Sequence, residues 1–358
     1  MKAVVLDAPY RFRMEDRPLP ALEAGWALIK VEAAGICGSD IHFYTGELPI
    51  EPGSVRGHEI AGTIADPGDT GLPKDQAVVV HPLVGCGVCT ACRRGEQQLC
   101  ASLTAVGGQH PGGFAEYAAA PLQNIYPFDV NALPFTQAAL ADCVAVAVHA
   151  MNAVGLKAGE SAVVLGDGTI GLLLLQVALA RGAHPVIVVG KHEFNLKLAR
   201  QWGASLAFDG TTQDPVATVQ ATAGQVDAVF EAVGGVAPPL GVGLKMLRKG
   251  GRLATLGLTG AEKLTVPWIE VVFGELSLIG VMGYGTFDGE DEMQQALDLM
   301  QAGQVALGPM ITLAVQLQDL DRGFRAMLSR TTGPCIKVVV LPQDASSPGT
   351  ERLEQPGP

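Results

Sequence analysis

The sequence predicts an α/β protein of two domains, one mostly β and one built on a doubly wound parallel sheet covered by helices. Two observations predict this division. Short apolar runs broken by Gly and Pro fill the first part of the chain, and apolar strands alternate with helical stretches from about Val144 to Met282. The length of 358 residues suits two domains of roughly 150 residues each, and the 48% of hydrophobic residues allows a core in both.

The mostly-β domain is expected to comprise residues 1–146 and 285–358. Its short strand-like segments are AVVL, ALIKVEAAGI, IAGTIA, AVVV and FAEYAAA, and the apolar segment CIKVVVL returns near the end of the chain. The final segment QDASSPGTERLEQPGP has no apolar periodicity, so we expect it to be disordered.

The parallel sheet is expected within residues 147–284. The segments SAVVLG, PVIVVG, VDAVFEAV, GRLATLG and LSLIGV are apolar throughout, and helical stretches such as LLLLQVALARGA and EFNLKLARQWGA separate them. Strands of this composition are typical of a sheet that helices cover on both faces.

A glycine motif follows the first of these strands. Gly166, Gly168 and Gly171 form the pattern GxGxxG, with Thr169 and Ile170 at the expected start of the next helix. The three glycines allow a tight turn, the approach of backbone to a pyrophosphate, and the packing of helix on strand. We therefore predict dinucleotide binding here, with a purely structural turn as the alternative.

The end of the second strand bears on which dinucleotide is bound. An NAD site usually has Asp or Glu there, but this chain has Gly190, followed by Lys191 and His192. The missing acid and the two basic residues favour the 2′-phosphate of NADP(H). Alternatively, Lys191 and His192 only begin a solvated helix, and NAD(H) is held by backbone groups.

Four of the seven cysteines lie within residues 85–101, namely Cys86, Cys89, Cys92 and Cys100. This spacing favours a tetrahedral zinc with a closed, structural ligand set, and an iron–sulfur cluster is the competing interpretation. Because four thiolates leave zinc no vacant position, catalysis is expected elsewhere.

Charge and hydropathy exclude several partners. The net charge of -12 and the pI near 5.0 oppose binding to nucleic acid or to an anionic membrane surface. The longest apolar run, from Ile170, has about 11 residues, fewer than the roughly 18 of a membrane span. The N-terminus lacks the pattern of a signal peptide, and cysteine-rich metal sites suit a reducing compartment, so we expect a cytoplasmic protein.

A second candidate metal site is scattered along the chain. Cys37 in AGICGSDIH and His58 in RGHEIAG offer two ligands, and Asp142 in ALADCVAVAVHA offers a third, which would leave one position open. Taken singly, these residues can also be a buried thiol, a core histidine and a helix cap.

In their order along the chain, these motifs resemble the zinc-dependent medium-chain dehydrogenase/reductase superfamily, which includes alcohol, sorbitol and threonine dehydrogenases. The resemblance covers CGSDIH, GHE, the four-cysteine lobe, an acid seven residues before His149, the glycine motif and the final IKVVVL. It implies a GroES-like catalytic domain at 1–146 and 285–358 and a Rossmann domain at 147–284.

The resemblance also implies a catalytic zinc and a structural zinc. Cys37, His58 and Asp142 match the catalytic ligands, Glu59 matches an acid that can approach that zinc, and Asp40 matches the carboxylate that orients the histidine. The four cysteines of the lobe match the structural zinc ligands.

Hydride transfer between an alcohol or carbonyl substrate and NAD(P)(H) is the activity that the resemblance implies. Ser39 matches the hydroxyl that takes the alcohol proton, His42 the residue that passes it to solvent, and Lys337 a basic residue near the pyrophosphate. Related proteins are homodimers or homotetramers, so we expect one of these states.

Two departures bear on the substrate. Sorbitol-dehydrogenase-like proteins have Tyr where this chain has Phe43, and an Arg-Tyr pair where it has Gly283-Tyr284. A secondary alcohol or a polyol-like compound is still the expected substrate. The alternatives are a zinc-independent reductase of the same fold and a non-catalytic nucleotide-binding protein.

Overall fold

The chain forms two compact units. The structure is a computed structural model that describes residues 1–235, 239–259, 263–329 and 334–343. Unit 1 consists of Met1–Cys92, Leu99–Asp142 and the described residues from Leu307 on, and unit 2 of Arg93–Gln98 and Cys143–Ala306. The domain limits expected from the sequence stay predictions, and the segment 344–358 lies outside the described residues.

Unit 1 is built on a mixed sheet of seven strands, which run in the order β10 (Ile125–Pro127), β6 (Ala77–Val80), β5 (Glu59–Asp66), β3 (Trp26–Gly35), β20 (Lys337–Leu341) and β19 (Ile311–Gln316), with β9 (Tyr117–Pro121) paired to β3. A second sheet consists of β1 (Lys2–Ala8), β2 (Arg11–Asp16) and β4 (Ser54–Val55), and β7 (Leu83–Val84) pairs with β8 (Thr104–Ala105). The helices α1 (Gly38–Thr45), α3 (Phe135–Ala138) and α11 (Leu320–Ser329) belong to this unit.

Strand register in unit 1 brings distant segments of the chain to one place. β3 pairs antiparallel with β5 so that Gly35 lies opposite Glu59, and with β20 so that Gly35 lies opposite Val339. The end of β3, the start of β5 and the start of β20 therefore meet. Apolar side chains such as Ile29 and Ile64 are fully buried in the core of this sheet.

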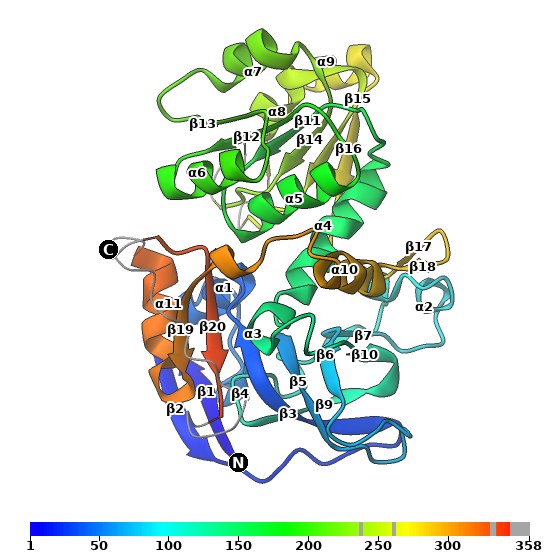
Figure 1. Ribbon diagram of the computed structural model, residues 1–358, viewed down its shortest axis with the longest axis vertical. Coiled ribbons are helices and arrows are strands. Elements are labelled where there is room, and N and C mark those ends of the chain that lie inside the picture. Colours follow the sequence, from blue (N-terminus) through cyan, green and yellow to red (C-terminus); the bar gives the residue numbers. More distant parts are fainter. Residues whose placement is uncertain (236–238, 260–262, 330–333, 344–358) are drawn as a thin grey trace. The chain divides into compact units, whose positions relative to one another are not determined.

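Unit 2 contains a parallel sheet of six strands in the order β13 (Leu206–Asp209), β12 (Val186–Gly190), β11 (Ala162–Leu165), β14 (Val226–Glu231), β15 (Leu247–Thr255) and β16 (Ser277–Gly280). In Figure 1, α5 (Thr169–Ala180) and α6 (Glu193–Gln201) lie in front of the strands. The remaining helices of the unit include α7 (Pro215–Ala223), α8 (Leu240–Met246), α9 (Trp268–Gly274) and α10 (Glu292–Gln301).

This strand order confirms the predicted doubly wound sheet. Val163 and Ile187 pack in one apolar cluster with Val219 of α7 and Leu244 of α8. The order of the strands reverses between β11 and β14, and ligands of such sheets bind beyond the carboxyl ends of the strands at that point. The glycine motif follows β11 and so lies at this position.

The state of the cysteines and the hydropathy of the helices bear on two expectations from the sequence. All seven cysteines are free thiols, which leaves them available to bind metal. None of the described helices is long and apolar enough to cross a bilayer.

Candidate active site

Three of the predicted metal ligands come together in unit 1. Single donor atoms of Cys37, His58 and Glu59 all lie within 4.8 Å of one another. Cys37 follows β3, and His58 and Glu59 stand at the start of β5, so the pairing of Gly35 with Glu59 brings the three side chains together. One thiol, one imidazole and one carboxylate are donors typical of a zinc site.

Asp40 links the first helix to the histidine of this group. Its Oδ2 accepts a hydrogen bond from the Cys37 N–H at 3.1 Å, which ties the start of α1. Its buried Oδ1 accepts no hydrogen bond in the described part of the chain and lies 3.7 Å from His58 Nδ1 and 3.8 Å from Arg56 Nε. A His58 ring whose Nδ1 faces Asp40 has Nε2 left for a metal, so this arrangement fits the group.

The charge of Asp40 is stabilised by its neighbours. Burial acts to raise the pKa of its carboxyl group, but His58 and Arg56 together with the Cys37 N–H lower that pKa below its usual value. Asp40 is therefore ionised at neutral pH, as a carboxylate that orients a histidine ligand needs to be.

Glu59 is held by a buried cation. Its Oε1 accepts a hydrogen bond from Lys337 Nζ at 2.5 Å, and the same Nζ donates to the carbonyl of Ile36 at 3.1 Å. Both side chains are almost fully buried. A Cβ at position 35 would lie 1.8 Å from Glu59 Oε2, so Gly35 provides the space for this pair. The structure thus places Lys337 against Glu59, and its expected role at the pyrophosphate stays a prediction.

Asp142 lies beside Glu59 rather than in the first group. It stands in the first turn of α4 (Ala141–Val154), and one of its carboxylate oxygens is within 4.8 Å of a Glu59 oxygen. Glu59 therefore lies close both to Asp142 and to the pair Cys37 and His58. All four residues were predicted from the sequence, with Glu59 as the acid that can approach the metal, and their roles as ligands stay predictions.

The proposed relay residues stand on α1. Ser39 and His42 are three positions apart, a spacing that places two side chains on one face of a helix. His42 Nδ1 forms a hydrogen bond of 2.6 Å with Glu47 Oε2, and this contact lowers the pKa of Glu47. Glu47 was not predicted, because nothing in its sequence position points to His42.

The four cysteines of the lobe form a second candidate metal-binding group. One sulfur from each lies within 4.8 Å of the others, and backbone N–H groups point at three of them at distances of 3.3 to 3.5 Å. The Cys92 N–H lowers the pKa of Cys89 to about 6, whereas burial raises the pKa of Cys92 to about 12. Amide donors around clustered sulfurs favour thiolates, so the lobe fits a tetrahedral metal.

The glycine motif has the geometry of a phosphate-binding turn. Gly166 has a φ of 114°, and a Cβ at Gly171 would lie 1.9 Å from the Gly166 carbonyl oxygen. A Cβ at Gly168 would meet nothing within 4 Å, and no side chain caps α5 at this residue. Two glycines therefore serve close packing, and the third leaves the amino end of α5 open to an anion.

Asp167 supplies an acid next to Gly190, the position at which the sequence lacks the usual one. It stands between the first two glycines of the motif, and its Oδ2 accepts hydrogen bonds from the N–H groups of Lys191 at 3.1 Å and His192 at 2.7 Å. Its Oδ1 lies 3.0 Å from the ring Nδ1 of His192. The acid within GDGTIG was the sequence signal for this contact.

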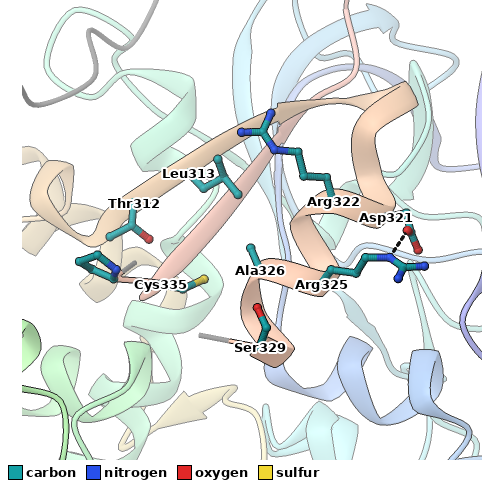
Figure 2. Close-up of a pocket in the computed structure, with 9 residues that line it drawn as sticks. Thr312, Leu313, Asp321, Arg322, Arg325, Ala326, Ser329 and Cys335 are labelled. Atoms are coloured by element: carbon teal, nitrogen blue, oxygen red, sulfur yellow. Dashed lines mark hydrogen bonds and ion pairs between the residues drawn. The ribbon is translucent and has the colours of Figure 1, made fainter. Parts of the chain in front are cut away.

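A pocket of about 550 Å³ lies elsewhere in unit 1, between β19 and α11. Figure 2 shows Arg325 paired with Asp321 at its rim and Cys335 on the opposite side. None of the predicted ligands or cofactor residues lines it, so its presence does not bear on the site described above.

Comparisons with known proteins agree with both units. Residues 23–130 match the alcohol dehydrogenase GroES-like domain, and residues 169–302 match the zinc-binding dehydrogenase domain. The chain is 31% identical to an L-threonine 3-dehydrogenase of Bacillus velezensis over 351 residues, which cover 96% of this chain and 99% of the relative.

Two solved structures show the same fold. One is a zinc-binding dehydrogenase target from Sinorhizobium meliloti 1021 bound to NADP, with a TM-score of 0.85 and 28% identity over 95% of this chain and 99% of the other. The second is an acetophenone reductase of Geotrichum candidum in complex with NAD, with a TM-score of 0.82 and 27% identity over 95% and 97%.

Proposed function

The chain belongs to the zinc-dependent medium-chain dehydrogenase/reductase superfamily, and on this premise we propose that it transfers hydride between NAD(P)(H) and a secondary alcohol or the corresponding carbonyl compound. It is a zinc-dependent, NAD(P)-dependent alcohol dehydrogenase by family. The observation that carries the proposal is the grouping of Cys37, His58 and Glu59 beside a carboxylate, Asp40, that faces the histidine.

The metal would be held by residues of unit 1. Cys37 and His58 are ligands in this proposal, and the two adjacent carboxylates, Glu59 and Asp142, supply the third. Zinc bound there supplies Lewis acidity, which favours the ionised form of a substrate hydroxyl or polarises a carbonyl group. Asp40 keeps the ring of His58 in the orientation that binding needs.

Proton movement is assigned to α1. The hydroxyl of Ser39 takes the substrate proton, and His42, which is partly exposed, delivers it to solvent. The carboxylate of Glu47 accepts the Nδ1–H of His42, which leaves Nε2 as the nitrogen that receives the proton.

The lobe cysteines are assigned to a structural zinc. Four thiolates complete a tetrahedral set and leave no position for a substrate oxygen. The amide hydrogen bonds to their sulfurs support this role, because they lower the energy of the thiolate form.

The substrate class follows from the reacting groups of relatives. Threonine carries a secondary hydroxyl and acetophenone is a ketone, and relatives of this chain are named for both compounds. A polyol-like substrate is less well supported, because the ring of Phe43 lies under the Arg56 guanidinium at 3.7 Å and Tyr284 is buried. We therefore propose a secondary alcohol or the corresponding ketone as the substrate.

The cofactor proposal has two candidates. The sequence favours NADP(H) through Gly190, Lys191 and His192, and related structures hold NADP in one case and NAD in another. Asp167 is the observation that favours NAD(H) instead, because its carboxylate already occupies the donors that a 2′-phosphate needs.

A homodimer is the proposed assembly, in the cytoplasm. In unit 2, α9 presents Trp268 and Phe273 with 68% and 74% of their surfaces exposed, and β16, which follows it in the chain, is the last strand of the sheet. Exposed aromatic groups next to an unpaired strand edge are typical of a surface that a second copy covers. The seven free thiols suit a reducing compartment.

The test is a spectrophotometric screen of secondary alcohols and ketones with NAD(H) and NADP(H). We expect turnover by the zinc-loaded wild type and none by Cys37→Ala, which should keep its fold and its affinity for dinucleotide. Cys335→Ala, which removes another half-buried thiol of unit 1, is the matched control and should retain turnover. Turnover by Cys37→Ala would overturn the proposal and favour a zinc-independent reductase.

A further inference from the structure

We propose that Asp167 selects NAD(H) over NADP(H) by rejecting the 2′-phosphate at the adenosine ribose. The inference rests on the proposed function, because it assumes that the glycine motif binds a dinucleotide. In dinucleotide-binding sheets an acid at the end of the second strand normally recognises the ribose 2′-hydroxyl, and this chain has Gly190 there. The acid is instead supplied by the turn after the first strand.

The side chain of Asp167 fills the space of the missing one. A Cβ added to Gly190 would lie 2.5 Å from both Cβ and Cγ of Asp167 and 2.6 Å from its Oδ2. The carboxylate thus stands where the side chain of residue 190 would begin. An acid at this place can accept a hydrogen bond from a ribose hydroxyl, as the usual acid does.

The same carboxylate occupies the donors that a phosphate would use. Asp167 accepts the N–H groups of Lys191 and His192 and lies against the His192 ring. Lys191 and His192 are the two residues whose basic side chains favour a 2′-phosphate in the sequence. A 2′-phosphate would have to displace Asp167 from them, and would meet its negative charge at close range.

The carboxylate is fixed in this position. Asp167 has only 4% of its surface exposed, and its carbonyl oxygen accepts a hydrogen bond from the buried Asn195 Nδ2 at 2.7 Å. The turn is thereby attached to α6, and the hydrogen bonds from the Lys191 and His192 N–H groups hold the carboxylate itself.

The surrounding charges do not offset this acid. Asp209, at the end of β13, is the register partner of Gly190 and adds a second carboxylate near His192. Lys191 is exposed to solvent, where its charge is screened. The two carboxylates, Asp167 and Asp209, therefore make this place less favourable for a 2′-phosphate than Lys191 and His192 alone suggest.

Binding of nucleotide fragments tests the inference without substrate or zinc. Isothermal titration calorimetry of the full-length protein with 5′-ADP and with 2′,5′-ADP isolates the effect of the 2′-phosphate, and titrations with NAD⁺ and NADP⁺ repeat it on whole cofactors. We expect the wild type to bind 5′-ADP and NAD⁺ at least about tenfold more tightly than their 2′-phosphorylated counterparts.

Two variants and one control assign the effect to Asp167. Asp167→Asn removes the charge but keeps the shape, and Asp167→Ala removes both, so each should reduce the discrimination to about threefold or less. Glu193→Gln removes an acid from the same helix start, where the side chain is 76% exposed and pairs with Arg200, and it should leave the wild-type ratio unchanged. Circular dichroism checks that each variant is folded.

Three outcomes would overturn the inference. Equal or tighter binding of 2′,5′-ADP by the wild type does so without any variant, and leaves the dehydrogenase proposal intact. Discrimination that persists in both Asp167 variants shows that another group causes it. If the protein binds neither fragment and neither cofactor, dinucleotide use itself fails, and the proposed function fails with it.

Discussion

Asp40 is the residue on which the geometry of the candidate zinc site depends most. One of its oxygens accepts the Cys37 N–H and the other faces the His58 ring, so a single side chain positions two ligands that lie far apart in the sequence. Neither contact involves the metal itself. Its effect on metal binding can therefore be separated from ligand loss.

Asp40→Asn should weaken zinc at the Cys37 and His58 site by about 10- to 100-fold. The amide still accepts the Cys37 N–H, so α1 is retained, but the negative charge that orients His58 is lost. Competition with a chelator of known affinity measures the change. Asp16→Asn, on an exposed strand end, is the control and should match the wild type. Unchanged affinity in Asp40→Asn would show that Asp40 does not position the ligand.

Lys337→Met should destabilise the protein by about 3–5 kcal/mol, because it leaves the buried Glu59 without its cation. Urea denaturation measures the loss. Arg325→Met removes one partner of an exposed ion pair, with 67% of the Arg325 side chain in solvent, and should change stability by less than about 1 kcal/mol. Equal effects of the two substitutions would contradict the assignment of a buried pair.

The sequence allowed many of the site residues to be predicted, but not the contacts that some of them make. Cys37, His58 and the glycines were predicted because their motifs are local. The contact of Lys337 with Glu59 depends on the pairing of β20 with β3 and on the space left by Gly35, neither of which is visible in a motif. Asp167 was overlooked because the role of an acid was sought only at position 190.

At the scale of elements, the carboxylate of Asp227 connects β14 to the residue that precedes β11 and to the start of β15. Asp227, at the start of β14, accepts hydrogen bonds from Ser161 N at 2.8 Å, Ser161 Oγ at 2.7 Å and Arg248 Nε at 2.7 Å. Burial acts to raise the pKa of Asp227, but Ser161 and Arg248 lower it below the usual 3.8. The carboxylate form therefore stabilises the fold.

Asp227→Asn should lower the free energy of unfolding by about 1–2 kcal/mol at neutral pH. Since the folded pKa lies below the unfolded value, the wild-type advantage is complete above the unfolded pKa and declines as pH falls through the folded one. The difference between the two proteins should thus be constant above about pH 5 and shrink progressively as the pH falls below about 4. Urea titrations between pH 7 and pH 3 measure this, with the exposed Asp298→Asn as control. A constant difference across the range would show that the charge of Asp227 is not responsible.

Elements were predictable where both of their faces are buried. The segments SAVVLG and PVIVVG form β11 and β12. A strand that is apolar throughout is stable only where both of its faces are buried, as in a parallel sheet covered by helices. In contrast, α9 was not predicted, since Trp268 and Phe273 are exposed and follow no pattern of burial within the chain. The start of α4 at Ala141 places Asp142 in its first turn, where the sequence offered a helix cap as its alternative role.

At the scale of the whole molecule, the exposed aromatic residues of α9 bear on assembly. Phe273→Glu should convert a homodimer into a monomer of 37.1 kDa, because a charge in the centre of an apolar interface is not compensated. Light scattering coupled to gel filtration measures the mass. Phe194→Glu, a matched change on α6, should leave the dimer intact. A dimeric Phe273→Glu protein would place the interface elsewhere.

The distribution of metal ligands over the molecule is the central feature of the account. The four lobe cysteines are close in sequence and their sulfurs form one group, whereas the fold brings Glu59 close to Cys37 and His58 and also to Asp142. In the proposed assignment, the structural site is therefore visible in the sequence itself, whereas the catalytic site depends on strand register.

Zinc content per chain tests this separation most directly. Plasma emission spectrometry on zinc-loaded, dialysed protein should find about two zinc ions per wild-type chain and about one in Cys37→Ser, with the remaining ion held by the lobe. One zinc ion in the wild type, or two retained in Cys37→Ser, would contradict the assignment of a second, catalytic zinc to Cys37.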